Sequence, residues 1–147
     1  MIVDDDQAIL ETLKKILECE GYKVDVAVSG REALSKLRSR FFNLVILDIK
    51  LPDMEGMDLL EKMNSLEKIV SGIKTIKIMM TGFSSEDYAI KSLNLGADAY
   101  LVKPVNPKNI LETIKSQINK QEEYDANNKL EIRKEKSKTA AFLKYYD

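Results

Sequence analysis

The stretch NLVILDIKLPDMEG, Asn43 to Gly56, decides the fold and raises the first functional question. Four consecutive aliphatic residues, Leu44 to Leu47, are typical of a strand that is buried on both faces of a sheet. The run ends at a carboxylate, Asp48, and an unpaired charge costs several kcal/mol to bury. Asp48 is therefore expected either at the rim of the sheet or at a site that neutralises it.

Short apolar runs alternate with stripes of helical spacing up to about residue 119. Short apolar runs cover residues 1–3, 24–28, 44–47, 76–80 and 99–102, and stripes of helical spacing follow them, starting near Ile9, Ala33, Leu59, Ala89 and Ile110. Continuous apolar strands that alternate with helices predict a parallel sheet with helices on both faces. The expected fold class is α/β, a doubly wound five-stranded parallel sheet.

Capping residues support the helix boundaries. Side chains suited to a helix N-cap are Asp6, Ser29, Ser84 and Asn106. Glycines placed where a helix would end are Gly21, Gly72 and Gly96. The five helices are therefore expected to lie between these residues.

The composition excludes several classes of protein. Lys and Arg number 23 against 24 Asp and Glu, so there is no net basic field for nucleic acid or an anionic membrane. The chain has no histidine, which excludes a Ser-His-Asp triad and His-ligated zinc, and its one cysteine, Cys19, excludes a Cys cluster and an intrachain disulfide. No apolar run approaches the roughly 20 residues of a membrane span. A cytoplasmic protein that relies on oxygen chemistry is expected.

The character of the chain changes after about Asn119. Residues 1–119 form the expected domain, and residues 120–147 are densely charged with both signs and hold no sustained heptad. A helical extension, a linker and a mobile tail remain open for this segment.

Polar residues follow four of the apolar runs. Asp4, Asp5 and Asp6 follow the first, Asp48 the third, Thr81 the fourth, and Lys103 with Pro104 the fifth. Because open parallel sheets bind ligands at the carboxyl ends of their strands, these residues are expected to converge at one edge. Clustered carboxylates without His or Cys suit a hard cation such as Mg²⁺, beside which a carboxylate can attack phosphorus. Lys103 and the Thr81 hydroxyl would then bind phosphoryl oxygens.

Each of these residues also has an ordinary structural explanation. The acids after the first run are typical of a helix N-cap, Thr81 and Asp48 of turns, and Lys103-Pro104 of a loop. Together those explanations need four independent coincidences at one sheet edge. The site interpretation is therefore preferred.

Four segments together resemble the receiver domain of two-component response regulators, in the chemotaxis-regulator-like superfamily. They are VDDD (Val3 to Asp6), LVILDIKLPDMEGMDLL (Leu44 to Leu60), IMMTGF (Ile78 to Phe83) and GADAYLVKPV (Gly96 to Val105). The likeness covers about residues 1–120 in order and spacing, and the motifs are jointly specific. It implies a flavodoxin-like (βα)5 fold with strand order 2-1-3-4-5.

The resemblance also implies residue roles. Asp48 would accept the phosphoryl group, with Asp4, Asp5, Asp48 and the Lys50 carbonyl as Mg²⁺ ligands. Thr81 and Tyr100 would be the switch pair, and Lys103 would bind the phosphate and precede a cis peptide to Pro104. A sensor histidine kinase or phosphotransfer protein would be the donor, and the chain would be a signalling domain rather than a true enzyme.

The resemblance also indicates how the signal would leave the domain. Phosphorylation would switch a surface made by the fourth helix, fifth strand and fifth helix, near residues 86–95, 99–102 and 107–118. That surface would bind an effector protein, an output domain missing from this sequence, or a second copy of the chain. Direct nucleic-acid binding by this chain is not expected.

The chain departs from the family pattern in ways that carry expectations. The first strand is short, and the segment of residues 64–75 is long and suggests an extended third helix. The tail after Asn119 has no helix-turn-helix pattern, so either a stand-alone receiver or a receiver cut from a longer chain is expected. Lys50 and Phe83 lie two residues after the phosphoacceptor and the switch hydroxyl. A long cation and a bulky ring there should hinder hydrolytic water, so slow self-dephosphorylation is expected.

Two other functions stay open at this point. A pseudo-receiver would use the same fold as an interaction module without phosphorylation, although the full set of site residues argues against it. A Mg²⁺-dependent aspartyl phosphohydrolase would need a second acid two residues after the nucleophile, where this chain has Lys50. The sequence contains neither G-x-x-x-x-G-K nor G-x-G-x-x-G, the glycine motifs that bind nucleotide phosphates, which argues against a nucleotide-binding enzyme.

Overall fold

A computed structural model describes residues 1–69, 74–82 and 86–146. Five parallel strands form one sheet in the order β2-β1-β3-β4-β5. They are β1 (Ile2–Val3), β2 (Val26–Ala27), β3 (Leu44–Asp48), β4 (Ile76–Thr81) and β5 (Ala99–Val102). The fold class and the strand order implied by the resemblance are both confirmed.

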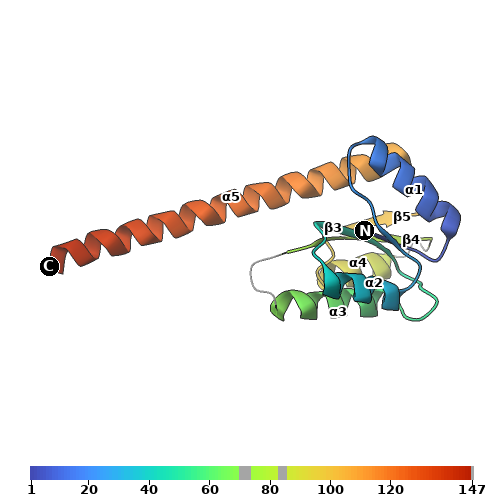
Figure 1. Ribbon diagram of the computed structural model, residues 1–147, viewed down its shortest axis with the longest axis horizontal. Helices are drawn as coiled ribbons and strands as arrows, with labels where there is room; N and C mark the ends of the chain where they lie inside the picture. Colours follow the sequence, from blue (N-terminus) through green and yellow to red (C-terminus); the bar gives the residue numbers. More distant parts are fainter. Residues whose placement is uncertain (70–73, 83–85, 147) are drawn as a thin grey trace. The chain divides into compact units, whose positions relative to one another are not determined.

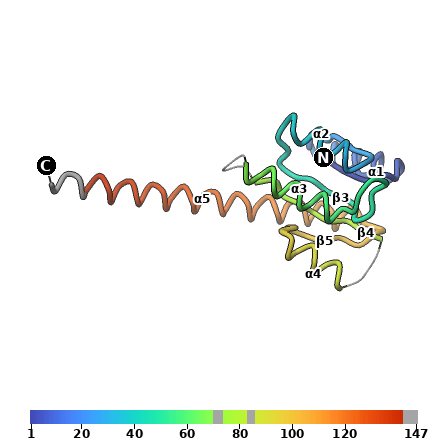
Figure 2. The backbone as a smooth tube through the Cα atoms, turned by 90° about the horizontal axis from the view of Figure 1, so that it is seen from below, coloured from blue at the N-terminus to red at the C-terminus, as the bar shows by residue number. Residues whose placement is uncertain are grey.

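Five helices alternate with the strands. They are α1 (Gln7–Cys19), α2 (Gly30–Ser39), α3 (Gly56–Ile69), α4 (Glu86–Asn94) and α5 (Pro107–Tyr146). Helices α2, α3 and α4 lie on one face of the sheet and α1 lies on the other (Figure 1). In the second view α2 runs beside α3, and α4 lies next to β5 (Figure 2).

Burial follows the alternation of side chains along each strand. Val45, Leu47 and Met79 share a cluster with Leu59 and Leu60 of α3. The neighbouring strand residues Ile46 and Ile78 point to the opposite face, as the two-residue period of a strand requires, and are also fully buried. The central strands are therefore covered on both faces, which is why they read as unbroken apolar runs.

Strand β2 is shorter than the apolar run of residues 24–28 suggests. As an edge strand, β2 pairs only with β1, and β1 itself has two residues. The register joins Ile2 to Val26 and Val3 to Ala27, so the remaining residues of the run have no ladder partner. The short first strand thus limits the length of the second.

The predicted helix ends are confirmed where the structure describes them. Asp6 accepts from the amides of Ala8 and Ile9, Ser29 accepts from Glu32, and Asn106 accepts from Lys108. Gly21 and Gly96 have φ of 88° and 93°, in the left-handed region that suits glycine after a helix. Ser84 and Gly72 lie outside the described residues.

The chain divides into two compact units, Met1–Thr113 and Ile114–Asp147. The second unit is the continuation of α5, whose described part runs to Tyr146 as an unbroken helix. It exposes apolar side chains at Tyr124, Leu130 and Ile132. Of the three possibilities for the tail, the helical one is found, while the boundary at residue 119 stays a prediction. Among the described segments, none of the helices combines the length and apolar character that a membrane span requires.

Candidate functional site

The register of the sheet brings the predicted site residues to one edge. Asp4 directly follows β1, Asp48 ends β3, Thr81 ends β4, and Lys103 directly follows β5. Because all strands are parallel, these positions lie at the carboxyl ends of neighbouring strands. The sequence-predicted convergence is therefore found.

Lys103 joins the two buried acids of this edge. Its ammonium donates to Asp4 Oδ2 at 2.7 Å and to Asp48 Oδ2 at 3.0 Å. Asp4 is fully buried and Asp48 is 8 % exposed. The second oxygen of Asp4 accepts from the Asp6 amide at 2.9 Å, which fixes the orientation of the carboxylate. Lys103 follows the edge strand β5, and it pairs with the carboxylates of Asp4, which follows β1, and Asp48, which ends β3.

The ion pairs do not fully compensate the burial of Asp4. Burial raises the pKa of Asp4 above its usual value, and the hydrogen bonds from Lys103 and the Asp6 amide offset this only in part. For Lys103, burial acts to lower the pKa, but the hydrogen bonds to both carboxylates outweigh it and the net shift is upward. Lys103 is accordingly charged at neutral pH, whereas burial destabilises the ionised form of Asp4.

A third acid completes an oxygen cluster. One carboxylate oxygen from each of Asp4, Asp5 and Asp48 lies within 4.8 Å of the others, and Asp5 is exposed. Three carboxylates so close together repel one another, and Lys103 supplies only one positive charge. An all-oxygen set with an open, exposed member fits Mg²⁺, which keeps several waters and shares its shell with a phosphate.

The resemblance assigns three further described residues to the site: Lys50, Thr81 and Tyr100. The Lys50 amide donates to Asp48 Oδ1 at 3.5 Å, a long contact, and the Lys50 side chain is exposed. Thr81 is fully buried and Tyr100 is half-buried. Burial raises the pKa of Tyr100, and a hydrogen bond with the Thr81 side chain opposes this shift. The two residues that the resemblance pairs as a switch are therefore in contact.

The Lys103-Pro104 peptide bond and Phe83 are the remaining predicted features of the site. The peptide bond between Lys103 and Pro104 is cis. Phe83 lies outside the described residues, so the expectation that it slows dephosphorylation stays a prediction.

Two contacts beside the site are not predicted by the sequence. Asp53 accepts from the amides of Gly30 and Arg31, both at 2.9 Å, and so joins the segment after β3 to the start of α2. Gly56 packs against the backbone of Asp48, where a Cβ would lie 2.1 Å from the carbonyl oxygen. The Asp53 contact has no local sequence signal, because Asp53 and its partners are more than 20 residues apart. The Gly56 contact depends on how the start of α3 lies against the end of β3.

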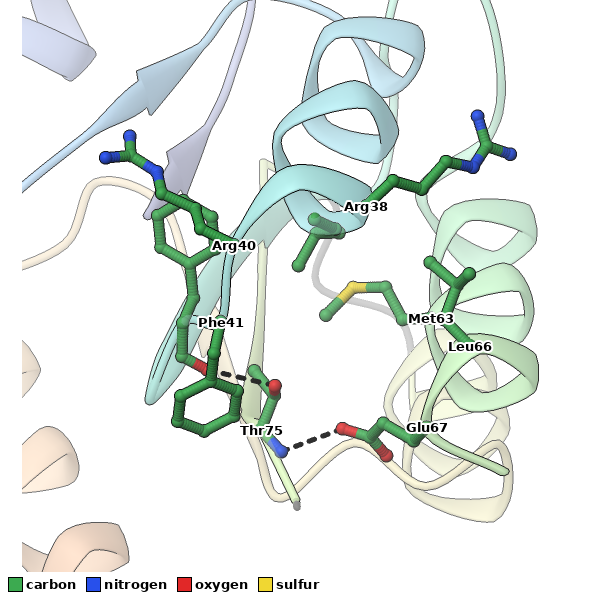
Figure 3. Close-up of a pocket in the computed structure, with 9 residues that line it drawn as sticks. Arg38, Arg40, Phe41, Met63, Leu66, Glu67 and Thr75 are labelled. Carbon is green, nitrogen blue, oxygen red and sulfur yellow. Dashed lines mark hydrogen bonds between the residues drawn. The ribbon is translucent and has the colours of Figure 1, made fainter. Parts of the chain in front are cut away.

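A separate pocket lies at the other ends of the strands. It measures about 280 Å³, and its walls include Leu37, Phe41, Phe42, Met63 and Leu66. Figure 3 shows Glu67 of α3 accepting from the Thr75 amide at the rim. Since Thr75 precedes β4, this pocket is at the amino edge of the sheet, and none of the described site residues lines it.

The protein is a doubly wound α/β protein in which Lys103 bridges two buried acids at the carboxyl edge of the sheet. Comparisons with known proteins identify the family to which it belongs. The family model for the response regulator receiver domain matches residues 1–115. A crystal structure of a CheY-like response regulator receiver domain protein from Methanospirillum hungatei JF-1 is 51 % identical, with a TM-score of 0.76 over 84 % of this chain and 94 % of that one. The chain belongs to the response regulator receiver domain family of two-component systems.

Curated relatives are longer than this chain. The transcriptional regulatory protein ZraR of Escherichia coli O157:H7 is 34 % identical over 114 residues, which are 78 % of this chain and 25 % of ZraR. The response regulator SaeR of Staphylococcus aureus strain USA300 is 33 % identical over 124 residues, 84 % of this chain and 52 % of SaeR. This chain thus spans between a quarter and about half of these relatives.

Proposed function

We propose that Asp48 accepts a phosphoryl group from a phosphohistidine of a sensor histidine kinase or phosphotransfer protein. The observation that carries the proposal is the Lys103 ammonium, which bonds both Asp4 and Asp48 at the carboxyl edge of the sheet. This cation stands beside the proposed nucleophile, where phosphoryl oxygens would arrive. A cytoplasmic location, where such donors present phosphohistidine, is part of the proposal.

The reaction at Asp48 is a displacement at phosphorus. A carboxylate oxygen of Asp48 attacks the phosphorus atom, the P–N bond to the donor imidazole breaks, and its electron pair stays on the ring nitrogen. The Lys103 ammonium exchanges a carboxylate contact for a phosphoryl oxygen, and the Thr81 hydroxyl donates to another. Both groups therefore stabilise charge that is carried by the transferred group.

The residues of the cluster fit a divalent cation. Asp4, Asp5, Asp48 and the backbone carbonyl of Lys50 would hold Mg²⁺, which when bound neutralises negative charge on the phosphoryl group and the carboxylates. The fit rests on the oxygen-only donor set and on the excess of acid over base at this edge. Lys103 already pairs with Asp48 at 3.0 Å and supplies positive charge beside it.

The proposed output surface is formed by α4, β5 and the first turns of α5. Thr81 contacts Tyr100 of β5, so a Thr81 side chain that turns toward a phosphoryl group would alter this contact. Apolar side chains are exposed on the same elements, with Ile90 and Leu93 on α4 and Val102 on β5. Phosphorylation would shift the population between two states of this surface, to which an effector protein, an output domain or a second copy of the chain binds.

Intact-protein mass measurement tests the proposal. Incubation with acetyl phosphate and Mg²⁺ is expected to add one phosphoryl group, and neither the reaction without Mg²⁺ nor Asp48→Asn should show the gain. A folded wild-type protein that gains nothing would favour a pseudo-receiver. Steady turnover of p-nitrophenyl phosphate would instead indicate a phosphohydrolase.

The burial of Asp4 predicts how stability depends on pH and on Mg²⁺. Because the folded pKa of Asp4 is raised above 3.8, the folded state binds the proton more tightly than the unfolded state. Lowering the pH from neutral through that raised pKa should therefore stabilise the metal-free wild type relative to Asp4→Asn, which does not titrate at this position. At neutral pH, free Mg²⁺ at 100 times its Kd should stabilise the wild type by about 2.7 kcal/mol.

Urea unfolding followed by circular dichroism measures both effects. The difference in free energy of unfolding between wild type and Asp4→Asn is expected to shift toward the wild type as the pH falls, and Mg²⁺ should stabilise Asp4→Asn much less. If the free energies of unfolding of the two proteins change in parallel with pH, the buried carboxyl of Asp4 is not the group that titrates.

A further inference from the structure

The segment that joins β3 to α3, residues 49–55, is a closed loop whose two ends meet beside Asp48. The Gly56 amide donates to the Ile49 carbonyl at 2.5 Å, and the Leu51 amide donates to the Met54 carbonyl at 3.2 Å. Lys50 and Glu55 form an antiparallel bridge across the loop. Because the Lys50 backbone is part of this bridge, its position depends on how the loop is held.

The tip of the loop is fastened to another element. Asp53 Oδ1 accepts from the Gly30 amide and Asp53 Oδ2 from the Arg31 amide, each at 2.9 Å. The adjacent Met54 side chain occupies the space beside Gly30, where a Cβ would lie 2.3 Å from the Met54 sulfur. A hydrogen-bonded clamp and a packing contact therefore join the loop to the first turn of α2.

The clamp satisfies a helix end that would otherwise need other partners. The first three amides of α2 belong to Gly30, Arg31 and Glu32, and the Ser29 hydroxyl accepts only from the last. Asp53 takes the other two and places a negative charge at the positive end of the helix. The bonds from the Arg31 and Gly30 amides hold the pKa of Asp53 below its usual range, so the carboxylate is charged at neutral pH.

We infer that Asp53 is a positioning residue for the phosphoacceptor site: by clamping the loop tip to α2, it holds the Lys50 carbonyl toward the cation that Asp4, Asp5 and Asp48 would share. This inference rests on the proposed function, since it concerns the Mg²⁺ ligands named there. Asp53 itself touches neither the cation nor the phosphoryl group. It acts by limiting the positions that the loop, and with it the Lys50 carbonyl, can occupy.

The geometry predicts a graded series of variants. Asp53→Ala removes both acceptors and releases the loop tip. Asp53→Asn keeps one acceptor oxygen and sets an amide nitrogen against the second donor, so one of the two bonds survives. Ser29→Ala is the matched control, because it removes a cap from the same end of α2 without touching the loop.

Isothermal titration of the full chain with MgCl2 tests the inference. Changes to groups that orient metal ligands typically cost 10- to 100-fold in affinity, and since Lys50 supplies one ligand of several, Asp53→Ala is expected to raise the Mg²⁺ Kd about tenfold. Asp53→Asn should fall between Asp53→Ala and the wild type. Ser29→Ala should bind Mg²⁺ within about twofold of the wild type while lowering the melting temperature about as much as Asp53→Ala does.

Amide hydrogen exchange on the metal-free protein gives a second reading that does not depend on Mg²⁺. Exchange at Leu51 and Gly56, whose amides close the loop, should accelerate in Asp53→Ala and remain unchanged in Ser29→Ala. If Asp53→Ala does not fold, Asp53→Asn carries both measurements.

Two results would overturn the inference. One is a Mg²⁺ Kd and loop exchange in the Asp53 variants equal to those of the wild type. The other is an equal rise in Kd in Ser29→Ala, which would assign the effect to the stability of α2. A wild-type chain that binds no Mg²⁺ would contradict the proposed function itself and remove the inference with it, so the two failures are distinguished by which protein fails to bind.

Discussion

Gly56→Ala is expected to destabilise the protein by about 3 kcal/mol, at the upper end of what overpacking costs. An added Cβ would lie 2.1 Å from the Asp48 carbonyl oxygen and 2.8 Å from the Ile49 Cα. Both are backbone atoms of the central strand and its extension, so neither can turn aside as a flexible side chain would. The start of α3 would have to move away from the phosphoacceptor, and urea unfolding measures the loss of stability directly.

Gly82→Ala is the control for this prediction. A Cβ on Gly82 meets nothing within 4 Å, and its φ is not in the left-handed region. Its free energy of unfolding should stay within about 0.5 kcal/mol of the wild type, as is usual for an exposed position. If Gly56→Ala and Gly82→Ala unfold at the same urea concentration, the close approach of α3 to Asp48 is wrong.

Glu67→Gln is expected to cost about 3 kcal/mol, because it leaves a buried ammonium without its counter-charge. Lys77 of β4 is 1 % exposed, and its ammonium donates to Glu67 Oε2 at 2.6 Å. Glutamine keeps an oxygen for the Thr75 amide, which donates to Glu67 Oε1 at 2.8 Å, but it removes the charge and presents an amide nitrogen to Lys77. The free energy of unfolding in urea reports the loss.

Lys77→Met separates the charge from the packing in this prediction. A methionine fills much of the same volume and needs no counter-charge, so Lys77→Met in the Glu67→Gln background should recover most of the lost stability. Additive losses in the double variant would show that the two side chains are not coupled, and would contradict the account of the pair.

The strands and the site edge could be predicted from the sequence because each follows from local pattern. The run from Leu44 to Leu47 is unbroken because β3 is covered on both faces, and Asp48 marks the point at which that cover ends. Thr81 and Lys103 occupy equivalent ends of β4 and β5, so parallel pairing alone brings them to the same edge. The order of the strands needed the resemblance, because periodicity does not specify which strands are neighbours.

Contacts between distant segments could not be predicted in this way. Asp53 looks like an ordinary turn residue after Pro52, and its partners at the start of α2 become neighbours only once the loop and the helix are placed. Lys77 interrupts an apolar strand, and only the position of Glu67 on α3 shows that its charge is paired. The charged composition of the tail shows no helical apolar stripe, so the sequence does not specify its helix, although the structure continues α5 through it.

Reductive trapping tests most directly whether Asp48 carries the phosphoryl group. Borohydride converts an aspartyl phosphate to homoserine, and trypsin should release residues 41–50, FFNLVILDIK, in which Asp48 is the one acidic residue. After treatment with acetyl phosphate and Mg²⁺, homoserine is expected at Asp48 in this peptide. Homoserine in the peptide that contains Asp4, Asp5 and Asp6, or in neither peptide although the protein has gained a phosphoryl group, would contradict the account.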